Sequence, residues 1–498
     1  MTRPFLAPVL WLILACPAAA DEPRPLEFSL TFDPAVSKEP FTGRVFVMLS
    51  RRPITAPKAG PEWFNTEPFF AVDVRDWKPN VPLVVGANAL GYPIKLPQLT
   101  KGNWYVQAIM DMDRGSPRIG NAPGNGFSKA IQQELDPASS GTVKLHIDQV
   151  AGERKFPASD RLRLVEIESK LLSAFNGRPT RLRAAVVLPK SFKDEPTRKY
   201  PLIIEVPSFS GTHFDAVWQA QRNPTEVGGV EMLYVVPDPS CRWGHSVFAD
   251  SDNNGPWGKA LTEELIPHIE KEFRGLGVPT ARFLTGYSSG GWSSLWLQVT
   301  YPDYFGGVWS LAPDPVDFRD FQKVNIYKPG ENMFFDEKGQ RRPIARQGGT
   351  PILFYKPFSD MELVMGHGGQ LGSFEGVFSE RGADGRPKQL WDRSTGAIDP
   401  DVARSWERYD IRLILERNWD KLGPKLAGKL NVFMGTDDTF YLEGATILLK
   451  ESLARLGSDA KIELFPGRDH SNLLDRNLRS RINAEMASQF RKHHPEAN

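Results

Sequence analysis

Residues 281–299 read Ala-Arg-Phe-Leu-Thr-Gly-Tyr-Ser-Ser-Gly-Gly-Trp-Ser-Ser-Leu-Trp-Leu-Gln-Val. A short apolar run ends at Leu284, and apolar side chains recur at helical spacing from Trp292 to Val299. Between them lies Gly286-Tyr287-Ser288-Ser289-Gly290. The stretch therefore predicts a strand, a sharp turn with a serine at its tip, and a helix, which is the context of a nucleophile elbow.

The chemistry of such an elbow depends on small residues around the serine. Gly286 and Gly290 have no Cβ, so the backbone and the helix can crowd against the turn. The hydroxyl of Ser288 is then a candidate nucleophile, and the amide of Ser289, at the helix N-terminus, is a candidate donor to an oxyanion. The alternative is an ordinary Gly/Ser-rich turn. The presence of a base and an acid that could act with Ser288 distinguishes the two interpretations.

The composition is that of an ordinary globular protein. The chain has 498 residues, of which 40% are hydrophobic and 11% aromatic, and this length predicts two or three domains. Lys and Arg number 61 against 60 Asp and Glu, giving a formal net charge of +1. Without a long charged run, nothing indicates a nucleic-acid partner.

The N-terminus has the pattern of a secretory signal peptide over residues 1–20. Arg3 precedes an apolar stretch at 6–15 that is too short to span a bilayer, and small residues at 18–20 provide a cleavage site. We therefore expect a periplasmic or secreted protein, with lipid anchoring at Cys16 as the alternative. If Cys16 is removed, Cys241 stands alone and no intrachain disulfide can form.

Two patterns divide the remaining chain. Residues 21–155 alternate apolar and polar side chains in short runs separated by Gly, Pro and Asn, which predicts a small antiparallel β-sandwich domain. Over 156–498, strand-like runs alternate with amphipathic helices, which predicts a parallel α/β sheet with flanking helices. This alternation of strands and helices stops at about 321–429, where we expect a lid-like insertion that acts as a lid or as a substrate wall.

A nucleophilic serine needs a base and an acid later in the chain. Asp438 follows the strand-like run 430–434, and His470 follows the run 462–465. Loops after parallel strands meet at one sheet edge, so His470 is the predicted base and Asp438, preferred to Asp437, the predicted acid. Asp314 and Asp317 are reserve candidates for the acid.

The second oxyanion donor is expected in the loop Ser208-Phe209-Ser210-Gly211-Thr212-His213. This loop follows the strand-like run 201–207, and its small residues let a backbone amide face the serine. We predict the amide of Phe209 or of Ser208. His213 is expected to be a pocket or structural residue rather than a second base.

From about residue 160 onward the chain resembles α/β-hydrolases of the esterase D type, which include enterochelin esterases, feruloyl esterases and mycolyltransferases. The resemblance lies in the residues Tyr200-Pro201-Leu202-Ile203-Ile204, Gly286-Tyr287-Ser288-Ser289-Gly290-Gly291, Gly435-Thr436-Asp437-Asp438 and Pro466-Gly467-Arg468-Asp469-His470. It implies that Ser288 is the nucleophile, Asp438 the acid and His470 the base.

Other patterns do not indicate a cofactor or a metal. Asp111-Met112-Asp113 is typical of a solvated acidic turn, and His367, flanked by Gly366, Gly368 and Gly369, of a flexible loop. The sequence contains no zinc-protease, phosphate-loop or dinucleotide motif.

Together these features predict a serine esterase that acts through an acyl-enzyme on a small-molecule or carbohydrate-linked ester. An acyltransferase of the same fold, and a ligand-binding protein with a vestigial triad, are the alternatives.

Overall fold

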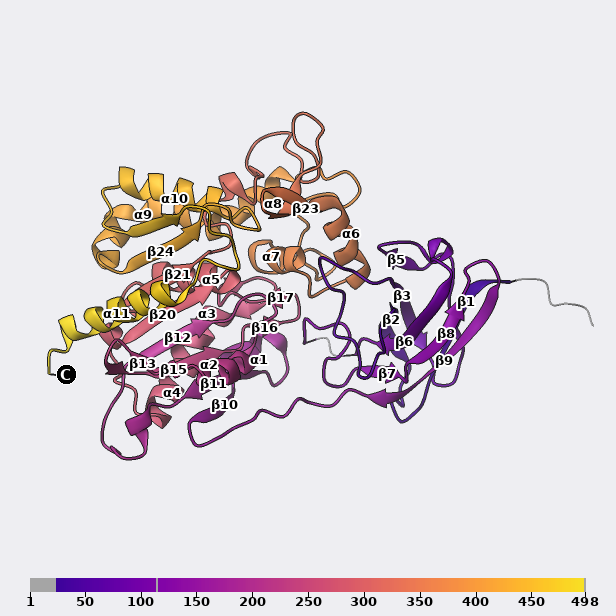
Figure 1. Cartoon of the computed structure of the whole chain (residues 1–498), viewed down its shortest axis with the longest axis horizontal. Helices are drawn as coiled ribbons and strands as arrows, with labels where there is room; N and C mark the ends of the chain where they lie inside the picture. Colours follow the sequence, from indigo (N-terminus) through magenta and orange to yellow (C-terminus); the bar gives the residue numbers. More distant parts are fainter. Residues whose placement is uncertain (1–23, 113–114, 497–498) are drawn as a thin grey trace, which may run out of the picture.

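The computed structural model describes residues 24–112 and 115–496. The predicted signal peptide, Cys16 and Asp113 lie outside the described residues. Two sheets organise the described chain, and Figure 1 shows the first on the right and the second on the left. Within these ranges, every helix is too short or too polar to cross a bilayer.

The first sheet has nine strands in the order β4-β1-β9-β7-β6-β2-β3-β5, with β8 also beside β6. All pairs are antiparallel except β1 with β9, which run parallel. The strands are β1 (Arg24–Phe32), β2 (Phe41–Ser50), β3 (Phe69–Trp77), β4 (Leu83–Val85), β5 (Leu90–Tyr92), β6 (Gly102–Met110), β7 (Gly126–Ser128), β8 (Ile131–Leu135) and β9 (Ser140–Val150).

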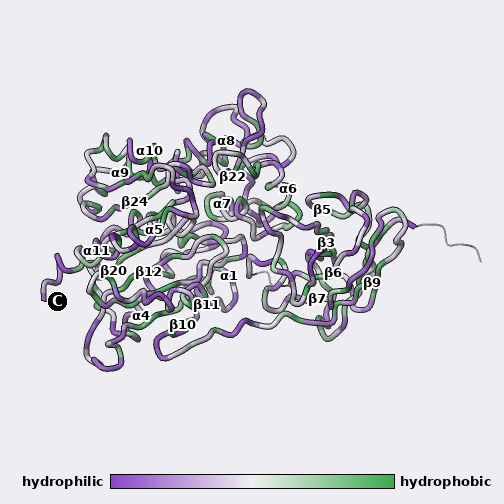
Figure 2. The backbone as a smooth tube through the Cα atoms, in the orientation of Figure 1, coloured by the Kyte–Doolittle hydropathy of each residue, from purple (hydrophilic) through white to green (hydrophobic). Residues whose placement is uncertain are grey.

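The predicted strand-rich region is confirmed, but its strands form one continuous sheet. Hydrophobic and hydrophilic residues alternate along β9 (Figure 2), so one face of the strand is apolar. Apolar residues from one face of β1, β2, β6 and β9 meet in a single buried cluster. The sheet therefore curls around its own core.

Strand β2 is buried on both faces. Val45, Val47 and Leu49 point into the core of the first sheet. Phe46 and Met48, on the opposite face, belong to the large apolar cluster that also contains the second sheet. The first sheet is thus packed directly against the rest of the molecule.

The second sheet has eight strands in the order β10-β11-β15-β12-β20-β21-β24-β25. The first three strands pair antiparallel and the last six, from β15, run parallel. They are β10 (Leu162–Glu168), β11 (Arg181–Val187), β12 (Leu202–Val206), β15 (Leu233–Pro237), β20 (Arg282–Tyr287), β21 (Gly307–Leu311), β24 (Leu430–Gly435) and β25 (Lys461–Phe465).

Helices cover both faces of this sheet. Side chains of α4, α5 and α10 join one apolar cluster, and those of α2 and α11 join the other. The helices are α1 (Lys170–Asn176), α2 (Ala216–Ala220), α3 (Trp257–Lys259), α4 (Ile266–Glu272), α5 (Ser289–Thr300), α10 (Glu443–Arg455) and α11 (Arg476–His493). Short strand pairs occur at β13 (Glu226–Val227) and β14 (Val230–Glu231), β16 (Ser240–Cys241) and β17 (Gly244–His245), and β18 (Asp250–Ser251) and β19 (Gly255–Pro256).

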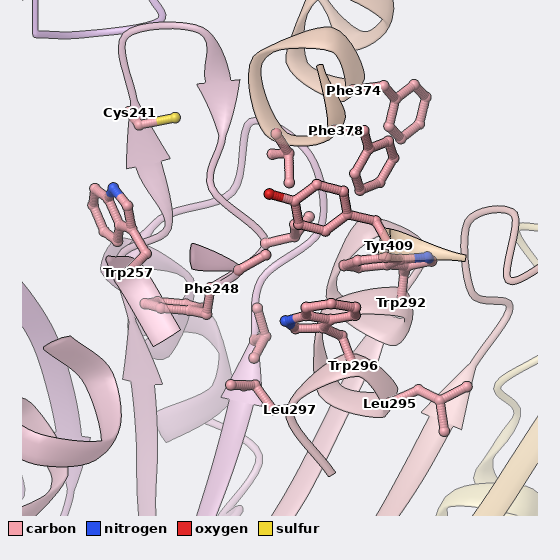
Figure 3. Close-up of a cluster of buried hydrophobic side chains, with 14 of the residues drawn as sticks. Cys241, Phe248, Trp257, Trp292, Leu295, Trp296, Leu297, Phe374, Phe378 and Tyr409 are labelled. Atoms are coloured by element: carbon pink, nitrogen blue, oxygen red, sulfur yellow. The ribbon is translucent and has the colours of Figure 1, made fainter. Parts of the chain in front are cut away.

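The chain between β21 and β24 forms an additional layer. It contains β22 (Pro343–Gln347), β23 (Thr350–Phe354), α6 (Tyr355–Met365), α7 (Gln370–Phe378), α8 (Pro400–Ser405) and α9 (Ile411–Leu426). Aromatic residues of this layer pack on α5. The rings of Trp292 and Trp296 on α5 stack on each other, and Phe378 and Tyr409 of the layer lie against them (Figure 3).

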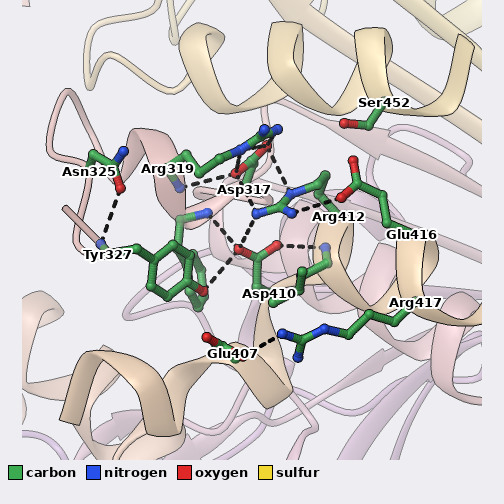
Figure 4. A network of polar contacts seen from close by, with 12 residues as sticks. Asp317, Arg319, Asn325, Tyr327, Glu407, Asp410, Arg412, Glu416, Arg417 and Ser452 are labelled. Atoms are coloured by element: carbon green, nitrogen blue, oxygen red, sulfur yellow. Dashed lines mark hydrogen bonds and ion pairs between the residues drawn. The ribbon is translucent and has the colours of Figure 1, made fainter. Parts of the chain in front are cut away.

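A buried charged network joins the start of this layer to its last helix (Figure 4). The guanidinium of Arg412 lies 3.2 Å from a carboxylate oxygen of Asp317 and 3.2 Å from one of Asp410. Tyr327 also donates a hydrogen bond to Asp410 at 3.0 Å. Because Asp317 follows β21 and Asp410 begins α9, the network fixes the first part of the additional layer against its last helix.

Candidate active site

Ser288 occupies a strained turn between β20 and α5. Its φ of 58° and ψ of −122° lie outside the regions that L-residues normally adopt. A Cβ on Gly290 would lie 2.0 Å from the carbonyl oxygen of Val206, and one on Gly286 would lie 2.2 Å from that of Gly290. Only glycine therefore fits at either position, as the predicted elbow requires.

His470 and Asp438 lie together at the same sheet edge. Nδ1 of His470 is 2.7 Å from Oδ2 of Asp438, and Asp438 is fully buried. The other carboxylate oxygen of Asp438 accepts a hydrogen bond from the amide of Phe440 at 2.8 Å, whereas Asp437 is exposed. Asp438 therefore holds the imidazole with Nδ1 engaged and Nε2 available for another group.

The imidazole is also held by its aromatic neighbours. Its ring makes edge contacts with Tyr287 at 5.1 Å and with Phe440 at 4.9 Å between centroids. The hydroxyl of Tyr287 donates to the carbonyl oxygen of His470 at 2.7 Å. Ser288 and His470 line the same cavity, of about 290 Å³.

The two reserve acids have different surroundings. Asp314 is buried beside the elbow, where it accepts hydrogen bonds from Ser288 Oγ at 3.4 Å and Ser289 Oγ at 2.5 Å. Burial raises the pKa of Asp314 to about 6. Asp317 instead pairs with Arg319 and Arg412 in the network of Figure 4. The carboxylate bonded to His470 is that of Asp438.

Two backbone amides remain candidate oxyanion donors. Within the described ranges, the amides of Phe209 and Ser289 have no hydrogen-bond acceptor. Ser289 is the first residue of α5, where a helix leaves its N–H groups free. The hydroxyl of Ser208 bonds to the carbonyl oxygen of Tyr287 at 2.9 Å, which fixes the loop. His213 is buried and paired with Asp238, which agrees with a structural role.

The remaining cavity wall comes from segments far apart in the sequence. Trp63 lies in the loop between β2 and β3 of the first sheet, and Phe440 lies in the loop between β24 and α10. The additional layer contributes Gln322, Ile344, Leu353, Phe358, Gln370 and Phe374. Sequence patterns did not identify these residues, because an isolated aromatic or amide side chain carries no local signal of a site. Their roles depend on the tertiary contacts.

Two expectations from the sequence are wrong. Asp111 is buried rather than solvated, and its carboxylate lies 2.6 Å from Nε2 of His367. The loop around His367 is therefore bonded to the first sheet rather than free. In the part of the chain that the structure describes, no group of three potential metal ligands occurs.

The strand order of the second sheet, with the serine turn after β20, defines an α/β-hydrolase. Residues 176–493 match the model of the Esterase family, described as "Putative esterase". The chain belongs to this family and is a carboxylic ester hydrolase.

Several solved structures match part of this chain at low similarity. A ferulic acid esterase matches with a TM-score of 0.40 and 15% identity, covering 66% of this chain and 99% of that one. An S-formylglutathione hydrolase from Agrobacterium tumefaciens matches with a TM-score of 0.38 and 14% identity, covering 66% and 94%. FphF, a fluorophosphonate-binding serine hydrolase of Staphylococcus aureus, matches with a TM-score of 0.39 and 15% identity, covering 66% and 98%. No curated protein matches in sequence.

Proposed function

We propose that the protein is a serine esterase whose catalytic triad is Ser288, His470 and Asp438. The observation that carries the proposal is the 2.7 Å contact between His470 and the buried Asp438, at the cavity that Ser288 also lines. The hydroxyl of Ser288 points toward Asp314 in this structure. Catalytic hydrogen bonds often tighten only when substrate binds, so a rotation of this side chain toward His470 is the expected first step.

The proposed reaction has two stages. Ser288 Oγ attacks the ester carbonyl as His470 Nε2 takes the hydroxyl proton, and Asp438 stabilises the imidazolium. The amides of Phe209 and Ser289 donate to the oxyanion. When this oxyanion intermediate collapses, the bond to the alcohol breaks, and the alcohol leaves with the proton from His470. Water, deprotonated by His470, then attacks the acyl-enzyme, and the carboxylic acid is released as Ser288 regains its proton.

The proposed substrate is a small-molecule or carbohydrate-linked ester. The cavity is mostly apolar, with a few polar groups in its lining, as is typical of sites for small ligands. Export to the periplasm or outside the cell remains a prediction from residues 1–20.

Hydrolysis of p-nitrophenyl acetate and butyrate tests the proposal. We expect turnover by the wild type and a loss of several powers of ten in kcat/KM for Ser288→Ala. Ser139→Ala, at an exposed turn of the first sheet, is the control and should behave as wild type. A fluorophosphonate should label the wild type but not Ser288→Ala. A protein that is neither active nor labelled contradicts the proposal and favours the ligand-binding alternative.

A further inference from the structure

The outer wall of the catalytic cavity is contributed by the first sheet. The loop 51–68, between β2 and β3, carries Trp63 into the cavity that holds Ser288 and His470. The indole ring lies 5.8 Å from the ring of Phe209, 5.1 Å from that of Phe358 and 6.2 Å from that of Phe440. These three rings belong to the oxyanion loop, the additional layer and the loop between the acid and α10. Trp63 therefore contacts three of the segments that line the cavity.

The loop that carries Trp63 is closed by a carboxylate at its base. Glu67 accepts hydrogen bonds from Ser50 Oγ at 2.9 Å, from the amide of Arg51 at 2.8 Å and from Lys58 Nζ at 2.7 Å. The amide of Lys58 also donates to the side chain of Gln107 on β6 at 3.2 Å. These contacts tie both ends of the loop to the sheet, so the indole ring has a defined position.

The first sheet is in turn fixed to the additional layer. Arg44 on β2 is paired with Asp73 at 2.7 Å and donates to the carbonyl oxygens of Leu363 at 2.8 Å and Val364 at 3.0 Å, at the end of α6. The contact between Asp111 and His367 is a second polar connection. Together with the apolar packing of β2, these bonds hold the sheet, and hence Trp63, against the cavity.

The cavity wall favours a small uncharged group. Besides Trp63, it consists mainly of aromatic and aliphatic side chains, and within the described ranges Asp314 and His470 are the only Asp, Glu or His residues that line it. No Lys or Arg of the described part of the chain lines it. At about 290 Å³ it is at the small end of ligand sites, which typically measure roughly 300–1,000 Å³. Replacing a ring that closes such a space changes the largest group that fits.

We propose that the first sheet is part of the active site and that Trp63 sets the largest ester group that the enzyme accepts. This inference rests on the proposed esterase function. Since one methylene group in an apolar pocket changes specificity by roughly 10- to 200-fold, removal of a whole indole has a measurable effect.

Two ester series test the inference in the full chain. The first varies the acyl group, from p-nitrophenyl acetate to p-nitrophenyl octanoate. The second varies the alcohol, from methyl acetate to 2-naphthyl acetate. For Trp63→Ala, we expect the ratio of kcat/KM for the largest to the smallest ester to rise at least tenfold in one series, which also identifies the group that the ring contacts. Trp63→Phe should give a smaller rise in the same series.

Controls separate a specificity role from a general effect. Trp218→Ala removes an indole that is 69% exposed on α2 and should leave both ratios unchanged. Glu67→Gln loosens the base of the loop without altering the cavity wall and should raise the same ratio as Trp63→Ala. Unchanged ratios in both series, for a Trp63→Ala protein with wild-type Tm and fluorophosphonate labelling, overturn the inference. A wild type that is neither active nor labelled overturns the proposed function as well.

Discussion

Asp314 lies beside the candidate nucleophile, with its Oδ1 3.4 Å from Oγ of Ser288. Its other oxygen accepts a hydrogen bond from Ser289 Oγ at 2.5 Å, and the carboxyl group is buried. A carboxylate so close to the place where an oxyanion forms would oppose the reaction unless its charge is balanced. The nearby His470, when protonated, lowers the pKa of Asp314, whereas burial, the larger effect, raises it to about 6.

The titration of Asp314 predicts a pH-dependent effect on stability. Its pKa is about 6 in the folded state against an ordinary 3.8, so the folded state binds the proton more tightly. The free energy of unfolding therefore falls as pH rises from about 4 to about 6 and stays lower above that range. The size of this fall is on the order of 3 kcal/mol.

The asparagine of the Asp314→Asn variant cannot be ionised, so the variant should lack this fall in the free energy of unfolding. We therefore expect the stability of the variant relative to wild type to be greater at pH 7.5 than at pH 4.5. Urea unfolding at both pH values measures it, with Asp76→Asn, an exposed acid of the first sheet, as the control. The same relative stability at both pH values would contradict the prediction.

Asp438→Asn should impair catalysis more than binding. An asparagine can keep the contact with His470 but not stabilise an imidazolium, and it favours the wrong tautomer. We expect kcat to fall by about 10⁴, as in other serine hydrolases, with a smaller change in KM. Steady-state hydrolysis of p-nitrophenyl butyrate measures both constants. Asp437→Asn is the matched control, since Asp437 is the exposed neighbour; equal losses in the two variants would reject Asp438 as the acid.

Gly290→Ala should disrupt the serine turn. The new Cβ would lie 2.0 Å from the carbonyl oxygen of Val206, so either the strand β12 or the start of α5 must move. We expect a loss of at least about 3 kcal/mol of stability and of esterase activity. Gly152→Ala is the control, because nothing lies within 4 Å of its added methyl group. Thermal unfolding and activity assays distinguish the two variants, and a Gly290→Ala enzyme with normal Tm and rate would show that the turn tolerates a side chain.

Arg412→Met should destabilise the protein strongly. It leaves the buried carboxylates of Asp317 and Asp410 without their shared cation, and breaking a buried pair in this way costs about 3–5 kcal/mol. Arg404→Met removes an exposed pair with Asp401 and should cost less than about 1 kcal/mol. Chemical denaturation gives both values. A similar small cost for the two variants would mean that the network in Figure 4 contributes little.

The serine turn and the order of the catalytic candidates were predictable, because neighbouring residues and the direction of the strands determine them. A glycine–serine turn between a buried strand and an apolar helix has few structural solutions, so residues 281–299 predict it without tertiary information. The positions of Asp438 and His470 follow from a rule of parallel sheets, which bring the loops after their strands to one edge. The strand pattern of residues 21–155 likewise follows from side-chain alternation.

Other features depended on the packing of distant segments. Nothing near Trp63 in the sequence indicates a cavity, and Asp111, two positions before Asp113, has the pattern of a solvated turn. Both residues acquire their surroundings when β2 packs against the second sheet and the additional layer covers the serine. The sequence by itself determined the α/β fold and the candidate catalytic residues, since each follows from neighbours a few positions away or from the direction of the strands. Only the tertiary structure decided what closes the cavity, because the contacts of Trp63 join residues that are more than a hundred positions apart along the chain.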